Sequence, residues 1–272
     1  MPVKEIRYEV KGAKTLPEMS WVEVEEALKR TDIVIVPVSS TESHGPHLPL
    51  ASDAINGTEM ARRTVKMLAE EGIEVVAGPT IPFGVTPGLL NFPGTICLRN
   101  RTAIELIKDV CRSLDHHGFK KIILMLAHGG NYATIQVAAE ELKDEIEADV
   151  YFATSLHVMT QAQGQILHSD RPTEEGHAGE GETSRILAIA PELVQMDKAE
   201  VFYPEKNKKK KVPGDQKPVM GGGWAVPVRD IRKVWPRSFR GNPKFATKET
   251  GEKLLDLRAR WLADLIKRDL VG

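Results

Sequence analysis

Short apolar runs alternate with amphipathic helical patterns through the first two thirds of the 272-residue chain. The first run, residues 33–38, reads Ile-Val-Ile-Val-Pro-Val, which is typical of a strand buried on both faces of a parallel sheet. Further strands are expected at residues 74–77, 121–127 and 150–154, and helices at residues 54–71, 102–117 and 132–147. This alternation predicts an α/β fold with three layers, α/β/α, around a mainly parallel sheet.

The chain, residues 1–272, is expected to form one domain, because no internal repeat is visible. Residues 202–245 contain six prolines and a run of four lysines, and they are expected to form an irregular loop insertion. Trp224 and Trp235 in this segment indicate a lid or a subunit contact, with a small satellite core as the alternative. Residues 247–268 predict a last amphipathic helix that covers one face of the sheet.

Composition excludes several classes of protein. Charged residues make up 28% and hydrophobic residues 41% of the chain, and the net charge of −1 gives no electrostatic reason to expect binding to nucleic acid or to a membrane surface. No apolar run approaches the roughly 20 residues of a membrane span, and the first residues lack the apolar core of a signal peptide. A cytoplasmic enzyme is expected, with Cys97 and Cys111 as reduced thiols.

A cluster of possible metal ligands follows the first predicted strand. Residues 42–53 read Glu-Ser-His-Gly-Pro-His-Leu-Pro-Leu-Ala-Ser-Asp, and open α/β sheets bind ligands at the carboxyl ends of their strands. Glu42 and His44 are two residues apart, so in an extended segment their side chains project to the same side and could hold zinc, manganese or iron. Asp53 could join them or could cap the helix that follows.

Two further clusters lie at comparable positions. His128 follows the expected strand at 121–127 and precedes Gly-Gly-Asn, a pattern that presents an imidazole at the sheet edge, although the glycines could serve only the turn. Residues 177–184 read His-Ala-Gly-Glu-Gly-Glu-Thr-Ser and open a helix, whose dipole alone would favour the two glutamates. Residues 78–88, rich in Gly and Pro, are expected to form a functional loop on the same rim.

Together the three motifs give the chain a specific likeness. They resemble the motifs of the creatininase family, creatinine amidohydrolase and its relatives. In this chain the motifs stand at residues 42–53, at residues 127–131, where Ala127 replaces a glycine, and at residues 177–184. The resemblance implies a creatininase-like three-layer fold with two divalent metal ions. Zinc is the expected metal, with manganese or iron as alternatives. It also implies a homo-oligomer, often a hexamer.

The resemblance assigns roles by motif. Glu42 and His128 would hold one metal ion, His44 would hold the other, and Asp53 would bridge the two. His47 ranks below His44 and is expected to support the site or to face the substrate.

One ligand of the family pattern is missing. Creatininase supplies a glutamate from a His-Tyr-Glu turn, where this chain has Gly130. Glu180 is the first candidate to replace it, and Glu182 is the second. His177 matches a family histidine associated with proton transfer, and either His177 or Glu182 would pass a proton to the leaving group. Creatinine is not expected as substrate, because no tryptophan stands between Trp21 and Trp224 to enclose it.

The expected function is metal-dependent hydrolysis of the C–N bond of a small amide, formamide or cyclic amide. The alternative within the same family is hydrolysis of a C–C bond in a carbocyclic diketone such as a dehydro-inosose of inositol catabolism. A non-catalytic protein that binds a metal or a ligand is the alternative of another class. Nucleotide binding is the weakest reading, since the Gly-x-Gly-x-x-Gly and Walker patterns are absent.

Overall fold

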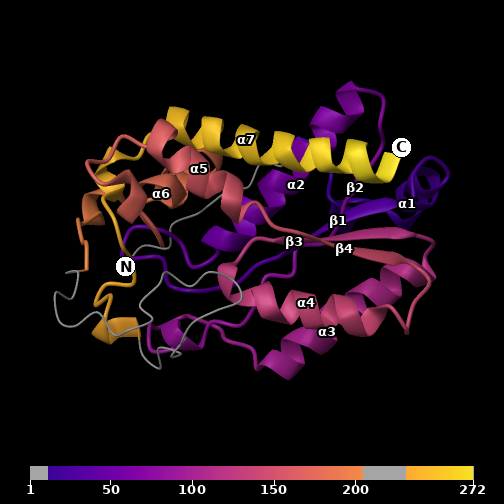
Figure 1. Ribbon diagram of the computed structural model, residues 1–272, viewed down its shortest axis with the longest axis horizontal. Coiled ribbons are helices and arrows are strands. Elements are labelled where there is room, and N and C mark those ends of the chain that lie inside the picture. Colours follow the sequence, from indigo (N-terminus) through magenta and orange to yellow (C-terminus); the bar gives the residue numbers. More distant parts are fainter. Residues whose placement is uncertain (1–11, 205–230, 272) are drawn as a thin grey trace, which may run out of the picture.

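The computed structural model describes residues 12–204 and 231–271 and has the α/β architecture that the sequence predicts (Figure 1). Its parallel sheet has the strand order β2-β1-β3-β4, with bounds β1 Ile33–Val38, β2 Val76–Ala77, β3 Lys121–Leu126 and β4 Asp149–Ala153. The α-helices in the described part are α1 Trp21–Leu28, α2 Ser52–Glu70, α3 Asn100–His116, α4 Tyr132–Leu142, α5 Leu156–Ile166, α6 Glu180–Ile189 and α7 Lys248–Ile266.

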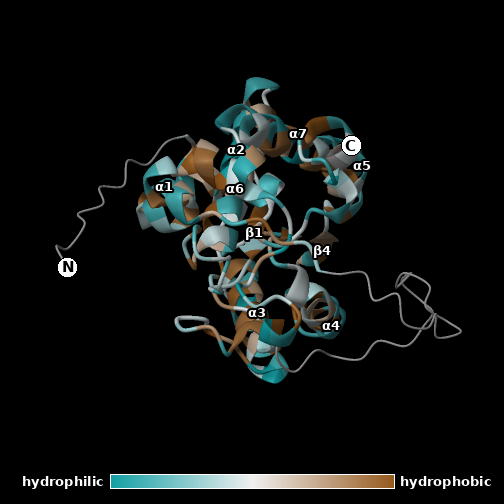
Figure 2. Ribbon diagram, turned by 90° about the vertical axis from the view of Figure 1, so that its left-hand side faces the viewer, coloured by the Kyte–Doolittle hydropathy of each residue, from teal (hydrophilic) through white to brown (hydrophobic). Residues whose placement is uncertain are grey.

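Alternation of side chains along the strands produces two apolar layers. In β1, Val34 and Val36 pack into a core with α3 and α4, whereas Ile33 and Ile35 pack on the other face with α2 and α7. Figure 2 shows α2 and α7 on one side of the sheet and α3 and α4 on the other. These four of the six β1 residues are at most 5% exposed, so the strand is buried on both faces, as its unbroken apolar sequence predicts.

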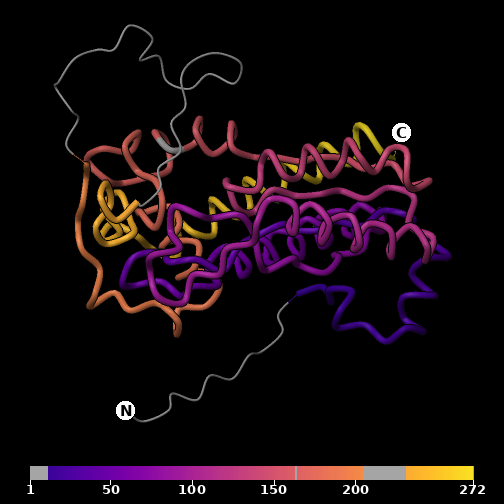
Figure 3. The backbone as a smooth tube through the Cα atoms, turned by 90° about the horizontal axis from the view of Figure 1, so that it is seen from below, coloured from indigo at the N-terminus to yellow at the C-terminus, as the bar shows by residue number. Residues whose placement is uncertain are grey.

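The connections that leave β1 and β3 run to opposite faces of the sheet. β1 pairs with β3 in register from Ile33 opposite Lys121 to Val38 opposite Leu126, so both strands end at the same edge. The chain then enters α2 on one face and α4 on the other, which leaves a crevice between the two strand ends. In Figures 1 and 3 the strands and the long helices lie along the longest axis of the molecule.

Most predicted elements are confirmed, with differences at their ends. β2 is shorter than residues 74–77, and α4 ends at Leu142 rather than at residue 147, because the chain turns there towards β4. α1 and α5 are helices that the sequence analysis does not predict. Within the expected insertion at 202–245, residues 205–230, with the lysine run and Trp224, lie outside the described residues.

Cys111 is buried on α3 and Cys97 is half-buried, and both are free thiols as expected. No helix in the described part of the chain combines the length and the apolar character needed to cross a membrane.

α6 and α7 pack closely against each other. A methyl group added at Gly251 of α7 would collide with the backbone of Ser184 on α6. Glycine at this point therefore allows α7 to lie directly against the helix that begins at Glu180.

We expect Gly251→Ala to lower the free energy of unfolding by about 1–3 kcal/mol, since α7 must move away from α6. Gly164→Ala is the matched control, because Gly164 lies on α5 and an added methyl group there meets nothing within 4 Å. Urea unfolding followed by circular dichroism measures both. Equal stability of the two variants would contradict the close contact.

Candidate metal centre

Carboxylates and imidazoles from four parts of the chain meet at the crevice between β1 and β3. Glu42 and His44 lie in the loop after β1, Asp53 in the first turn of α2, His128 after β3, and Glu182 in the first turn of α6. Three overlapping groups of the described residues are suited to a metal ion: Glu42–Asp53–His128, His44–Asp53–Glu182 and Glu42–His44–His177. The structure thus brings together the expected residues Glu42, His44, Asp53 and His128.

Asp53 is the member common to the first two groups. Its Oδ1 lies 3.3 Å from Nε2 of His44, and its Oδ2 lies 3.1 Å from Nδ1 of His128. Two ligands of one tetrahedral zinc ion, each about 2.0–2.1 Å from it, lie roughly 3.3 Å apart. Ser40 donates a hydrogen bond to Oδ2 over 2.8 Å and fixes the carboxylate. The N-cap of α2 is Ala51, without a side-chain hydrogen bond, so Asp53 does not cap this helix.

The two imidazoles are oriented so that one nitrogen of each faces the carboxylates. Nδ1 of His44 lies 3.1 Å from the carbonyl oxygen of Glu42, and Nε2 of His128 lies 3.2 Å from the carbonyl oxygen of Val85. A carbonyl can only accept, so these nitrogens carry the protons of the neutral rings. When the rings are neutral, Nε2 of His44 and Nδ1 of His128 therefore carry the lone pairs, as metal ligands require.

The buried charges of the cluster need a cation. Glu42 is 2% exposed, and its Oε2 has no hydrogen-bond partner in the described part of the chain. Burial opposes the ionisation of Asp53, but the charges of His44 and His128 outweigh it and hold the pKa of this carboxyl well below its ordinary value. Burial likewise opposes protonation of His44, but Asp53, Glu182 and Glu42 raise its pKa to about 10. In the absence of metal, protons on the imidazoles therefore balance the carboxylates.

Glu182, the second candidate for the missing ligand, lies at the cluster, and Glu180 does not. Oε2 of Glu182 is 3.7 Å from Nε2 of His44 and accepts a hydrogen bond from the backbone N–H of Ala178 over 2.6 Å. The carboxylate of Glu180 is fully buried elsewhere, where it accepts the backbone N–H groups of His168 and Ser169 at 2.7 and 2.8 Å. The structure thus places Glu182, and not Glu180, beside the other candidate ligands.

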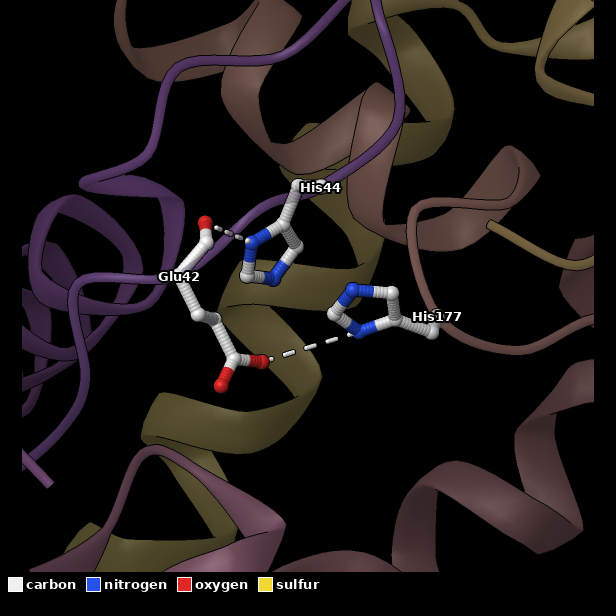
Figure 4. Close-up of side chains that lie close together, drawn as sticks. All are labelled: Glu42, His44 and His177. Atoms are coloured by element: carbon white, nitrogen blue, oxygen red, sulfur yellow. Dashed lines mark hydrogen bonds and ion pairs between the residues drawn. The ribbon is translucent and has the colours of Figure 1, made fainter. Parts of the chain in front are cut away.

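His177 lies beside the cluster and faces Glu42 (Figure 4). Its Nε2 is 2.7 Å from the carbonyl oxygen of Ser43, so this nitrogen donates, and Nδ1 is 3.8 Å from Oε1 of Glu42. The ring lies 4.2 Å from that of His44 and is stacked on Trp235 at 6.0 Å. Burial, and then the charge of His44, lowers the pKa of His177, so the ring is neutral at pH 7.

His47 is packed outside the cavity and contacts α6. It is fully buried, and its Nε2 lies 2.9 Å from the hydroxyl of Thr183 on α6. Burial lowers the pKa of this imidazole to about 4, so it is neutral. His47 thereby ties the ligand loop after β1 to the helix that carries Glu182, and it does not line the cavity.

The loop at residues 78–88 supports His128, as its position on the same rim suggests. The side chain of Asn131 accepts the N–H of Val85 at 2.9 Å and donates to the carbonyl of Ser39, which holds the loop in place. A methyl group added at Gly130 would collide with both Nε2 of His128 and the carbonyl oxygen of Val85. A glutamate at this position is incompatible with the hydrogen bond that orients His128.

A cavity of about 440 Å³ opens onto the cluster. Its wall includes two buried arginines that the sequence analysis missed, Arg185 of α6 and Arg258 of α7. Arg258 could have been found from the sequence, because it is a charged residue within the apolar stripe of α7. It stands four residues after Leu254 and four before Leu262, and both leucines are buried.

The sequence pattern of the creatininase family, described as creatinine amidohydrolase, matches residues 17–266. The chain belongs to the creatininase family. Its curated relatives include the 3-dehydro-scyllo-inosose hydrolase of Thermotoga maritima, 26% identical over 93% of this chain and 84% of the relative. The mycofactocin precursor peptide peptidase of Mycolicibacterium smegmatis is 27% identical over 87% and 85%, and the creatinine amidohydrolase of Pseudomonas putida is 26% identical over 93% and 95%. These relatives are hydrolases, and so is this chain.

Solved creatininase structures share the fold. One creatinine amidohydrolase superposes with a TM-score of 0.76 at 23% identity, over 95% of this chain and 98% of its own. A manganese form of creatininase gives a TM-score of 0.76 at 24% identity over 95% and 100%. A mutant creatininase of the Zn–Zn type gives 0.71 at 24% identity over 96% and 100%. The creatininase-like α/β fold is thus confirmed.

We expect Gly130→Ala to weaken metal binding about 10- to 100-fold although it removes no ligand, because it displaces the partner that orients His128. Gly129→Ala is the control, since an added methyl group there meets nothing within 4 Å. Titration against a chromogenic chelator measures the affinity. Unchanged binding in Gly130→Ala would show that Val85 does not orient the ligand.

Metal affinity should rise with pH. The pKa values of His44 and His128 stand above the ordinary 6.5, so a divalent ion must displace their protons at neutral pH. We expect the affinity for zinc to increase between about tenfold and a hundredfold per pH unit from pH 6 towards 9. Chelator competition at several pH values tests this, and a flat profile would contradict it.

The stability of the metal-free protein should fall with pH, because the protons on His44 and His128 stabilise the folded state. A raised pKa contributes stability that is complete below 6.5, the unfolded value, and is lost as the pH rises through the folded value of about 10 for His44. Thermal melting of the metal-free protein should therefore shift to lower temperature across this range.

Proposed function

We propose that the chain is a two-metal hydrolase that cleaves the C–N bond of a small amide, formamide or cyclic amide. The observation that carries this proposal is the position of Asp53, whose two oxygens face two different ligand sets. A carboxylate shared in this way is suited to bridge two divalent cations. Zinc is the expected metal, with manganese or iron as alternatives.

Each cation would have its own ligands. Glu42 and His128 would hold one, His44 and Glu182 would hold the other, and Asp53 would contact both. Two divalent ions bound there supply an activated water and a polarised carbonyl. The unpaired Oε2 of Glu42 and the free nitrogens of the two imidazoles support this assignment.

His177 is the residue best placed to move protons. Its Nε2 donates to the carbonyl of Ser43, so the lone pair lies on Nδ1, on the side of Glu42. Nδ1 would take a proton from the attacking water and return it to the nitrogen of the leaving group. The stacked ring of Trp235 holds the imidazole in this orientation. Glu182 is the other candidate for this step, but its Oε2 faces His44 and accepts a hydrogen bond from the backbone N–H of Ala178.

A second candidate is hydrolysis of a C–C bond in a carbocyclic diketone. The similarity to an inosose hydrolase over 93% of the chain favours it, whereas the similarity to a peptidase and to creatinine amidohydrolase favours C–N cleavage. The products distinguish the two: an amine or formate supports the amide hydrolase, and a ring-opened acid without nitrogen supports the second candidate.

Paired glutamine variants test the ligand set. Glu182→Gln should lower metal content and reduce turnover at least about a hundredfold, because it removes a charged ligand. Glu180→Gln is the matched control on the same helix, and it should retain metal while losing stability, because it weakens the acceptor for His168 and Ser169. Elemental analysis and thermal melting measure the two effects.

Two outcomes would contradict the proposal. Loss of metal from Glu180→Gln alone would restore Glu180 as the ligand. A metal-replete protein that hydrolyses no amide, formamide or cyclic ketone would support the non-catalytic alternative. The homo-oligomeric state and the cytoplasmic location stay predictions from the sequence.

A further inference from the structure

Two buried arginines form part of the inner wall of the cavity. Arg185, on α6, is 6% exposed, and Arg258, on α7, is 8% exposed. Both line the same cavity as Glu42 and His128. A guanidinium ion this deeply buried is costly unless a carboxylate or another acceptor balances it.

Among the described residues, neither arginine has a charge-assisted hydrogen bond to a carboxylate. Nη2 of Arg185 lies 3.5 Å from Oε1 of Glu182, which is longer than a charge-assisted hydrogen bond, and its Nε has no partner among the described residues. Nε of Arg258 donates to the hydroxyl of Ser155 over 3.0 Å. Within residues 12–204 and 231–271, no carboxylate forms an ion pair with Arg258.

Arg63 provides a comparison, because carboxylates surround its guanidinium group. Arg63 forms ion pairs with Glu59, Glu252 and Asp256, each at 2.7 Å, and its pKa is raised. Burial, and then the charge of Arg185, instead lowers the pKa of Arg258 to about 9. Arg258 is still charged at pH 7, and it lacks the partners that Arg63 has.

The carboxylates near the two arginines have other partners. Asp53 faces His44 and His128, and Glu182 lies between His44 and Arg185. In the proposed function, on which this inference rests, two divalent ions would use these negative charges. The guanidinium groups would then have no counter-charge until an anion enters the cavity.

We propose that Arg185 and Arg258 form a subsite that binds a carboxylate group of the substrate. Glu182 turns one oxygen towards His44 and the other towards Arg185, so the subsite lies one side chain away from the candidate metal centre. Other parts of the cavity wall are apolar, with Leu89, Met159 and Leu254. The substrate class is therefore a small amide or cyclic amide that carries a carboxylate close to the scissile carbonyl.

Arg258 carries the test, because Arg185 also contacts a proposed metal ligand. The probes are the monohydroxamate of succinate and its twin, in which the free carboxylate is replaced by a carboxamide. The hydroxamate group of each probe chelates the metal, and its carboxylate or carboxamide group lies at the proposed subsite. The two probes have the same length and differ in one charge. Isothermal titration of the zinc-loaded protein measures binding without turnover.

The wild-type protein should bind the carboxylate probe at least about tenfold more tightly than the carboxamide probe. Arg258→Met, which keeps the length of the side chain, should remove this difference and leave the carboxamide affinity within about twofold. Arg260→Met is the matched control, since Arg260 is exposed on the same helix. It should behave as the wild type.

Equal affinity of the wild-type protein for the two probes would overturn the subsite, whatever the variants show. If neither probe binds the zinc-treated protein, the metal centre of the proposed function fails instead. Thermal melting checks the fold of Arg258→Met. Should that variant not fold, Arg258→Lys keeps the charge but loses the forked donor geometry, and it should retain only part of the preference for the carboxylate.

Discussion

The parallel pairing of β1 with β3 is the constraint on which the site depends. It ends two adjacent strands at one edge of the sheet, while their connections depart to opposite faces. The ligand loop that holds Glu42 and His44 and the turn that holds His128 therefore meet in the crevice between them. α2, which follows the ligand loop, brings Asp53 between the two imidazoles, so the backbone arrangement creates the shared carboxylate.

The candidate ligands that follow strands, Glu42, His44 and His128, could be predicted from the sequence, because a strand end and a polar motif are both local signals. The sequence could not decide between Glu180 and Glu182, because both belong to one motif in the first turn of one helix. Residues two apart on a helix point about 200° away from each other, so only one of the two can face the crevice. Which one does is decided by how α6 packs against α2 and α7, a long-range property that the motif does not contain.

The residues that the sequence did not single out act through contacts between distant segments. Ser40 supports Asp53, the carbonyl of Val85 supports His128, and the carbonyl of Ser43 supports His177. Two of the three use backbone oxygens, which have no sequence signature.

The support that Val85 gives to His128 couples the loop at residues 78–88 to the candidate metal centre. Asn131 holds this loop beside His128, because its side chain accepts a hydrogen bond from the N–H of Val85. The same loop supplies the oxygen that decides which nitrogen of His128 bears the proton. In the proposed two-metal centre, a sequence change that moved this loop would therefore also change how firmly a cation bound to His128 is held. As long as Asn131 holds the loop, the rest of its sequence could vary without that effect.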